Sequence, residues 1–204
     1  GWKERFSPVK VTFFETGSSH SYAQFKTGIF NVLMISSMKA YKGVFELIEI
    51  AKKLLSKKEI TITLVLNASQ SDIDVFFNDV ALPSNITLIN QQTNVIPFYE
   101  NASLVLNLSR PDQWIETFGL TILEALSFGI PVIVPPVGGP SEIVADGKEG
   151  YLMSSYEIDA IVKKIEYLFN NPEKCMELSN NAKLRAHYFN EENFNTAITQ
   201  FLHV

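Results

Sequence analysis

The chain has 204 residues, of which 46% are hydrophobic and 19% charged, with 17 basic and 22 acidic side chains. This length predicts one sizeable domain or two small ones, and the apolar fraction excludes an intrinsically disordered segment. The formal net charge of -5 argues against a nucleic-acid binder, which needs a basic surface. The single cysteine, Cys175, excludes an internal disulfide and is typical of a reducing compartment, so we expect a cytoplasmic protein.

The apolar pattern predicts strands that alternate with helices. Ile29–Ser36 is a short apolar run typical of a buried strand, and the apolar spacing over 44–55 predicts a helix. The β-branched run 60–66 predicts a second strand, followed by a helix that begins with a capping box at Ser71 and Asp74. Further strands are expected over 86–89, 103–108, 131–134 and 151–153, and helices over 95–101, 117–128, from 138 onward and from 157 to the end.

This alternation predicts an α/β fold, a doubly wound Rossmann-like parallel sheet of about six strands with helices on both faces and a helical C-terminal tail. We expect an N-terminal linker or interdomain segment over 1–28, the Rossmann-like domain over 29–170, and C-terminal helices that pack on it over 171–204. The chain begins without an initiator methionine or a signal peptide, which is typical of a piece of a longer protein.

One carboxylate stands in an otherwise apolar helix. Glu124 is the only charged side chain between Thr117 and Ser141, and a buried lone carboxylate is costly unless it is paired or hydrogen-bonded. Either a partner from elsewhere in the fold, such as a lysine or backbone amides, satisfies Glu124, or Glu124 accepts hydrogen bonds from the hydroxyl groups of a ligand. The start of this helix lies at the carboxyl edge of the predicted sheet, where such folds bind ligands, and this position favours the second interpretation.

A second carboxylate, Glu116, precedes Glu124 by eight positions, and Gly119 lies between them. Glycine lets the backbone approach a ligand closely, and the free N–H groups of a first helical turn stabilise phosphate. The spacing therefore predicts a cleft in which a phosphate cradle and two carboxylates bind a sugar nucleotide.

Two segments carry a resemblance to a known family: ETFGLTILEALSFGIPV at 116–132 and GGPSEIVADGKEG at 138–150. Together they resemble the donor half of family-four retaining glycosyltransferases, which share an E-x7-E signature and a GT-B architecture of two Rossmann-like domains. The segment KAYKG at 39–43 is similar to the lysine–glycine pair after the family's first strand. The resemblance covers roughly residues 29–169.

The resemblance implies retaining transfer of a sugar from a UDP-, GDP- or ADP-sugar to an acceptor hydroxyl, in polysaccharide or glycoconjugate synthesis, without a metal or other cofactor. The acceptor would be a sugar, a glycan or a lipid-linked molecule. It would bind to an N-terminal domain absent from this chain, and that half would also carry any peripheral association with the inner face of a membrane. The chain alone is expected to be inactive.

Each matching residue receives a role from the resemblance. Glu116 would bind hydroxyls of the transferred sugar and Lys42 would neutralise the departing diphosphate, so these two are the expected catalytic residues. Glu124 would hold the ribose hydroxyls. The other expected donor-binding residues, for the phosphates, the glycine turn and the base, are Ser37, Lys39, Phe118, Gly119, Leu120, Thr121, Gly138, Gly139, Asn90 and Gln91.

The chain departs from the family at Ser37, where an arginine is usual. Lys39 or Arg110 could supply the missing charge, because both are expected at adjacent strand ends. Two alternatives stay open: another GT-B enzyme such as an epimerase or a glycogen-type synthase, and a non-catalytic nucleotide-sugar-binding module whose site has decayed. No separate charged cluster of the kind an epimerase needs is recognisable, and the retention of Glu116, Glu124 and Lys42 opposes decay.

Overall fold

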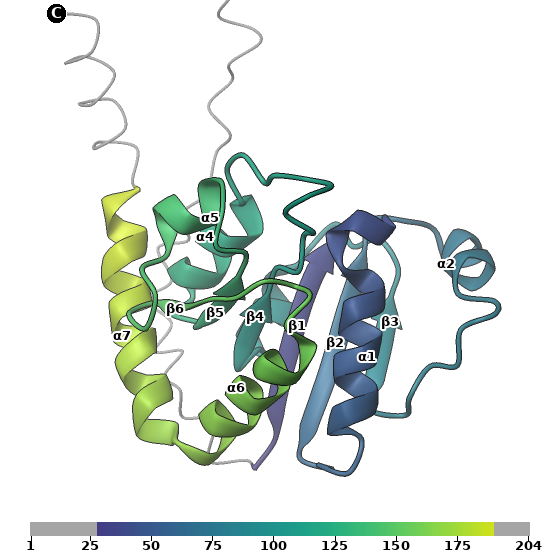
Figure 1. Cartoon of the computed structure of the whole chain (residues 1–204), viewed down its shortest axis with the longest axis horizontal. Coiled ribbons are helices and arrows are strands. Elements are labelled where there is room, and N and C mark those ends of the chain that lie inside the picture. The colour runs from purple at the N-terminus through teal and green to yellow at the C-terminus, as the bar shows by residue number, and fades with distance from the viewer. Residues whose placement is uncertain (1–27, 190–204) are drawn as a thin grey trace, which may run out of the picture.

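The structure, a computed structural model, describes residues 28–189, and these form one six-stranded sheet with helices on both faces (Figure 1). All strands are parallel, in the order β3-β2-β1-β4-β5-β6, which is that of doubly wound nucleotide-binding folds. The predicted fold class is confirmed. The strands are β1 Phe30–Ser36, β2 Ile60–Leu66, β3 Ile86–Ile89, β4 Leu104–Leu106, β5 Val132–Val134 and β6 Gly150–Leu152.

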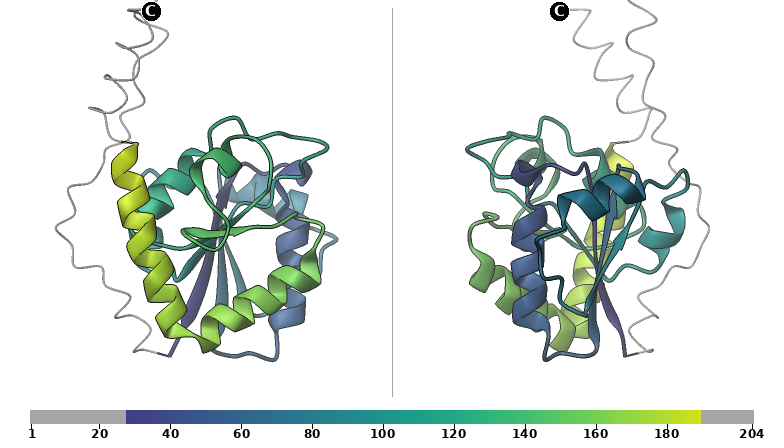
Figure 2. Two further views of the ribbon diagram at one scale, coloured as in Figure 1. Left: turned by 60° about the vertical axis from the view of Figure 1, so that its left-hand side comes forward. Right: turned by 90° about the vertical axis from the view of Figure 1, so that its right-hand side faces the viewer.

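Helices connect these strands and cover the sheet. The turned views in Figure 2 show them on both sides of the twisted strands. The elements are η3 Ala40–Lys42, α1 Val44–Leu54, α2 Gln70–Phe76, α3 Ile96–Glu100, α4 Leu120–Ser127, α5 Gly139–Ile143, α6 Ile158–Asn170 and α7 Pro172–Tyr188. The expected helix beyond α7 lies outside the described residues.

Two apolar clusters, one on each face, hold the sheet between its helices. On one face, α1 and α6 pack on alternate residues of β1 such as Val32 and Met34. On the other face, α3 and α4 pack around Leu33 and Val65, and the second half of α7 joins them through Ala182. Because parallel strands are buried on both faces, their sequences read as nearly continuous apolar runs, which is why they could be located without the structure.

Several predicted boundaries are wrong by a few residues. The helix expected from Thr117 begins at Leu120, because Gly119 adopts a left-handed conformation with φ of 76° and acts as its N-cap. The strand expected over 103–108 is shorter, covering Leu104–Leu106 as β4. Both corrections leave Glu116 in an irregular segment between β4 and α4, where its backbone is held by other parts of the chain.

The predicted capping box of α2 is also wrong. The N-cap is Ser69 rather than Ser71: the Ser69 hydroxyl accepts a hydrogen bond from the backbone N–H of Asp72 at 3.2 Å. The same hydroxyl lies 2.6 Å from the Asp72 carboxylate. Asp74 instead accepts a hydrogen bond from the side chain of Gln70.

Ser69→Ala should therefore lower the free energy of unfolding by about 1 kcal/mol, because an N–H group of the first turn loses its acceptor. Ser71→Ala is the matched control: the Ser71 hydroxyl lies 2.9 Å from that of Ser69 but accepts no backbone N–H within residues 28–189, so its loss should cost less, about 0.5 kcal/mol. Urea denaturation of both variants measures the difference. Equal effects of the two substitutions would contradict the assignment of the cap.

Candidate functional site

The two predicted catalytic residues, Lys42 and Glu116, lie close together at the switch point between β1 and β4. On one side of this point the strands are added in the order β1, β2, β3, and on the other in the order β4, β5, β6. Lys42 ends η3, which follows β1, and Glu116 lies in the segment after β4. The Lys42 Nζ atom is 2.7 Å from Glu116 Oε2, and the two side chains are 16% and 21% exposed. Doubly wound folds bind ligands at this switch point, outside the carboxyl ends of the strands.

Two aromatic residues that the sequence analysis missed surround Lys42. Its ammonium lies over the ring of Trp114, 4.8 Å from the centroid, a distance typical of a cation–π contact. Trp114 in turn stacks on Tyr41, with centroids 5.3 Å apart and planes 20° apart. Trp114 is exposed, and a tryptophan two residues before Glu116 was the available signal in the sequence.

A second ion pair lies beside the first. Arg110 Nε donates to Glu46 Oε1 at 2.7 Å, and the Glu46 side chain is only 8% exposed. This bond raises the pKa of the Arg110 guanidinium. The backbone N–H of Arg110 donates to the carbonyl of Tyr41 at 2.8 Å. Arg110 therefore connects the segment after β4 with η3 and with α1.

The glycine turn after β5 supports Glu116 from the other side. The Gly139 N–H donates to the Glu116 carbonyl at 2.8 Å. A Cβ atom at Gly139 would lie 2.5 Å from the carbonyl oxygen of Thr117, so only glycine permits this approach. Gly138, expected to contact the donor, adjoins the backbone of Glu116 in the same way.

The N-terminus of α4 presents free backbone donors next to this cluster. In the described part of the chain, the N–H groups of Leu120 and Thr121 have no acceptor. Gly119 is buried at the cap, whereas Phe118 and Leu120 are exposed. An eight-residue helix with unpaired first-turn N–H groups stabilises a negative charge at this end.

Glu124 has a partner from elsewhere in the fold, as the first of its two interpretations expected, although this partner is a tyrosine rather than a lysine or backbone amides. The hydroxyl of Tyr99, on α3, donates to Glu124 Oε2 at 2.6 Å. Tyr99 is 1% exposed and stacks on Phe128. Burial above all, and then the charge of Glu124 and the hydrogen bond to it, raise the pKa of Tyr99 well above 10. Glu124 is half-buried, one turn into α4, and its second oxygen is available to a ligand.

Tyr99→Phe should lower the free energy of unfolding by about 1.5–3 kcal/mol at neutral pH, because a hydrogen bond to a carboxylate is lost. In the native protein, Tyr99 contributes stability that is complete below pH about 10 and decreases above it. The unfolded chain releases the phenolic proton there while the folded chain keeps it, a loss of up to about 1.4 kcal/mol per pH unit. Denaturation between pH 8 and 11 measures the difference between the two proteins, and parallel curves would contradict it.

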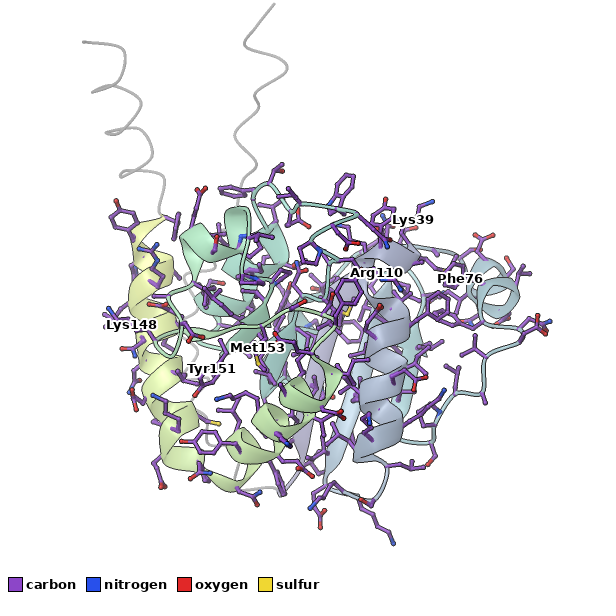
Figure 3. All side chains as sticks on the ribbon, viewed as in Figure 1. Lys39, Phe76, Arg110, Lys148, Tyr151 and Met153 are labelled. Carbon is purple, nitrogen blue, oxygen red and sulfur yellow. The ribbon has the colours of Figure 1, made fainter. Side chains whose placement is uncertain are left out.

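The remaining expected donor residues lie at the same edge of the sheet. The carbonyl of Lys39 accepts a hydrogen bond from the backbone N–H of Lys42 at 3.0 Å, but within residues 28–189 no ion pair joins the side chains of this group to Lys42 or Glu116. Ser37 and Lys39 follow β1, and the Lys39 side chain is exposed near the start of α1 (Figure 3). Asn90 and Gln91 follow β3. The Asn90 side chain accepts a hydrogen bond from Gln92, and the Gln91 N–H donates to the carbonyl of Ala68.

Residues 28–189 contain neither a candidate metal cluster nor a candidate membrane-spanning helix. No group of three or more histidine, cysteine, aspartate or glutamate residues in that part could hold a metal ion. No helix there is long and apolar enough to cross a membrane. The expectation that no metal or cofactor takes part stays a prediction.

Comparisons with known proteins show the family of the chain. Residues 22–185 match the family described as Glycosyl transferases group 1. The capsular polysaccharide biosynthesis glycosyltransferase CapM of Staphylococcus aureus is 27% identical over 147 residues, which cover 71% of this chain and 38% of CapM. The trehalose synthase of Thermococcus litoralis is 27% identical over 176 residues, 80% of this chain and 40% of the synthase.

The fold has solved counterparts. The structure of Anabaena HepE in complex with UDP superposes with a TM-score of 0.76 at 21% identity, over 94% of this chain and 54% of HepE. The chain thus spans 38–54% of the length of these three proteins.

Proposed function

Because the chain belongs to the glycosyl transferases group 1 family, we propose that it is the donor-binding domain of an enzyme that transfers a sugar from a nucleotide diphosphate to an acceptor hydroxyl. The proposal includes the E-x7-E subtype, retention at the anomeric carbon, and a GT-B partner domain for the acceptor. The observation that carries it is the contact of Lys42 with Glu116, 2.7 Å apart at the β1–β4 switch point.

The chemistry of transfer requires a positive charge at this place. The bond between the anomeric carbon and the phosphate oxygen breaks, and its electron pair stays on the diphosphate. A bond to the acceptor oxygen forms on the same face, and the hydroxyl proton passes to the leaving diphosphate or to solvent. Lys42 and the free N–H groups of α4 would stabilise the growing negative charge.

Glu116 changes partner in this scheme. In the structure its side chain is paired with that of Lys42. A diphosphate carries more negative charge than one carboxylate and would compete for the ammonium group. Glu116 would then accept hydrogen bonds from hydroxyl groups of the transferred sugar, beside the anomeric carbon.

The nucleoside would lie on the α3 side of the site. Glu124 projects from α4 toward α3, where Tyr99 holds one of its oxygens. The other oxygen would accept hydrogen bonds from the ribose. Asn90 and Gln91, at the exit of β3, would adjoin the base. HepE, of the same fold, has been crystallised with UDP, which makes a UDP-sugar the first donor to test.

The two relatives are named for different products, both of which are carbohydrates. CapM is named for capsular polysaccharide synthesis, and the trehalose synthase for a disaccharide. We propose polysaccharide or glycoconjugate synthesis in the cytoplasm, with a sugar, glycan or lipid-linked acceptor. The division into a linker at 1–28, a donor domain at 29–170 and packing helices at 171–204 is part of the same proposal.

Calorimetric titration of the chain with UDP-, GDP- and ADP-glucose tests the donor site. Selective binding of one nucleotide is expected, and Glu124→Ala should weaken it about tenfold or more, because hydrogen bonds to a charged group are lost. Glu173→Ala, at an exposed position of α7, is the matched control and should bind normally. The proposal fails if neither the chain nor the complete protein binds any of the three nucleotides.

A further inference from the structure

The guanidinium of Arg110 is already hydrogen-bonded to side chains of the protein. Its Nε donates to Glu46 Oε1 at 2.7 Å, and its Nη1 lies 3.4 Å from Gln113 Oε1. Glu46 Oε2 is buried and has no other partner in the described part of the chain. Removal of the guanidinium would therefore leave a buried carboxylate without any cation beside it.

The ion pair of Arg110 with Glu46 connects the segment after β4 with α1, across the switch point. Glu46 lies in the first turn of α1, directly after the segment that carries Lys42. Arg110 begins the segment that carries Trp114 and Glu116. Three more contacts join the same two segments: the Arg110 N–H with the Tyr41 carbonyl, the stack of Tyr41 on Trp114, and the cation–π contact of Lys42.

We propose that Arg110 is a positioning residue, which through its ion pair with Glu46 sets the place of Lys42 and Glu116 and does not itself contact the donor diphosphate. The expected effect on donor binding rests on the proposed function, whereas the positioning of Lys42 and Glu116 rests on the contacts above. It replaces the expectation that Arg110 supplies the charge missing at Ser37. Lys39, whose exposed side chain has no ion pair in the described part of the chain, stays the candidate for that charge.

A comparison of single and double variants tests the proposal. Arg110→Gln alone leaves Glu46 without its cation, and Glu46→Gln alone leaves Arg110 without its carboxylate. In the double variant, both charges are gone and the two amides can form a neutral hydrogen bond. Each protein is titrated with UDP, GDP and ADP, and thermal denaturation verifies that it folds.

The two roles of Arg110 give opposite patterns of affinity. For a positioning role, Arg110→Gln should weaken nucleotide binding about tenfold or more, and the double variant should recover to within about threefold of wild type. For a direct contact, the single and double variants should lose affinity equally, which would overturn the proposal. Unchanged binding in Arg110→Gln would overturn it as well. If Arg110→Gln does not fold, the comparison of the double variant with wild type decides alone.

A second readout does not depend on donor binding. The chain has two tryptophans, Trp2 and Trp114, so in a Trp2→Phe background, excitation at a wavelength that tyrosine does not absorb reports on Trp114 alone. Acrylamide quenching of Trp114 should increase in either single variant, as the segment after β4 is released, and return to the background value in the double variant. Unchanged quenching in both single variants would contradict the proposal that the Arg110–Glu46 pair holds the segment after β4 in place. If no nucleotide binds to the wild-type chain, only the donor assignment is affected.

Discussion

Replacing Lys42 with glutamine is expected to lower the rate of sugar transfer by the complete enzyme about 10²–10³-fold. The ammonium group lies at the switch point, 2.7 Å from Glu116 and over the face of Trp114. The negative charge on the diphosphate grows as the glycosidic bond breaks, so a fixed positive charge stabilises the transition state more than the bound donor. The loss should therefore appear mainly in kcat, with a smaller change in KM.

Initial-rate measurements over a range of donor concentrations separate the two constants. Lys58→Gln is the matched control, because it removes the same charge from an exposed position just before β2, at the opposite end of the strands. That variant should transfer sugar at the wild-type rate. A Lys42→Gln enzyme that keeps its kcat, or that loses only donor affinity, would show that this lysine does not act on the leaving group.

The overall fold could be predicted because it depends on local periodicity. The strands over Ile60–Leu66 and Ile86–Ile89 have the predicted bounds, since β-branched residues and flanking turns mark both ends. Alternation of strands with helices and the right-handed rule for parallel crossovers then predict a doubly wound parallel sheet. None of this requires knowledge of contacts between distant residues.

The predicted starts of α2 and α4 were wrong, because they depend on how other parts of the chain are placed. Ser69 with Asp72 and Ser71 with Asp74 have the same spacing, and both fit a capping box. The choice depends on where the chain leaves β2, which places Gln70 at the start of α2. The start of α4 likewise depends on the loop after β5, through the hydrogen bond of Gly139 with Glu116.

The sequence placed Lys42 and Glu116 at one edge of the sheet, where the structure also has them, but it did not predict that they pair. The two residues were assigned separate tasks, yet in the structure each is the other's partner. The partner of Glu124 is 25 positions away on another helix, and that of Arg110 is 64 positions away. Such pairs arise from packing, so spacing along the chain carries no signal for them.

Gly43→Ala is expected to lower the free energy of unfolding by about 3 kcal/mol or more, from two causes that act together. Gly43 has φ of 82°, a left-handed conformation that costs other residues roughly 1–2 kcal/mol. A Cβ atom there would also lie 2.2 Å from the carbonyl oxygen of Leu108, just beyond β4. That contact is with backbone, so relief requires α1 and the chain after β4 to separate, at a further cost of roughly 1–3 kcal/mol.

Gly147→Ala separates the two causes. Gly147 has φ of 77°, but a Cβ atom there would meet nothing within 4 Å, so only the conformational cost of roughly 1–2 kcal/mol applies. Denaturant unfolding of both variants should show Gly43→Ala as clearly the less stable. Because Gly43 directly follows Lys42, nucleotide binding should also weaken in Gly43→Ala and remain normal in Gly147→Ala. Equal losses of stability would mean that the close approach of α1 to the end of β4 does not fix the position of Lys42.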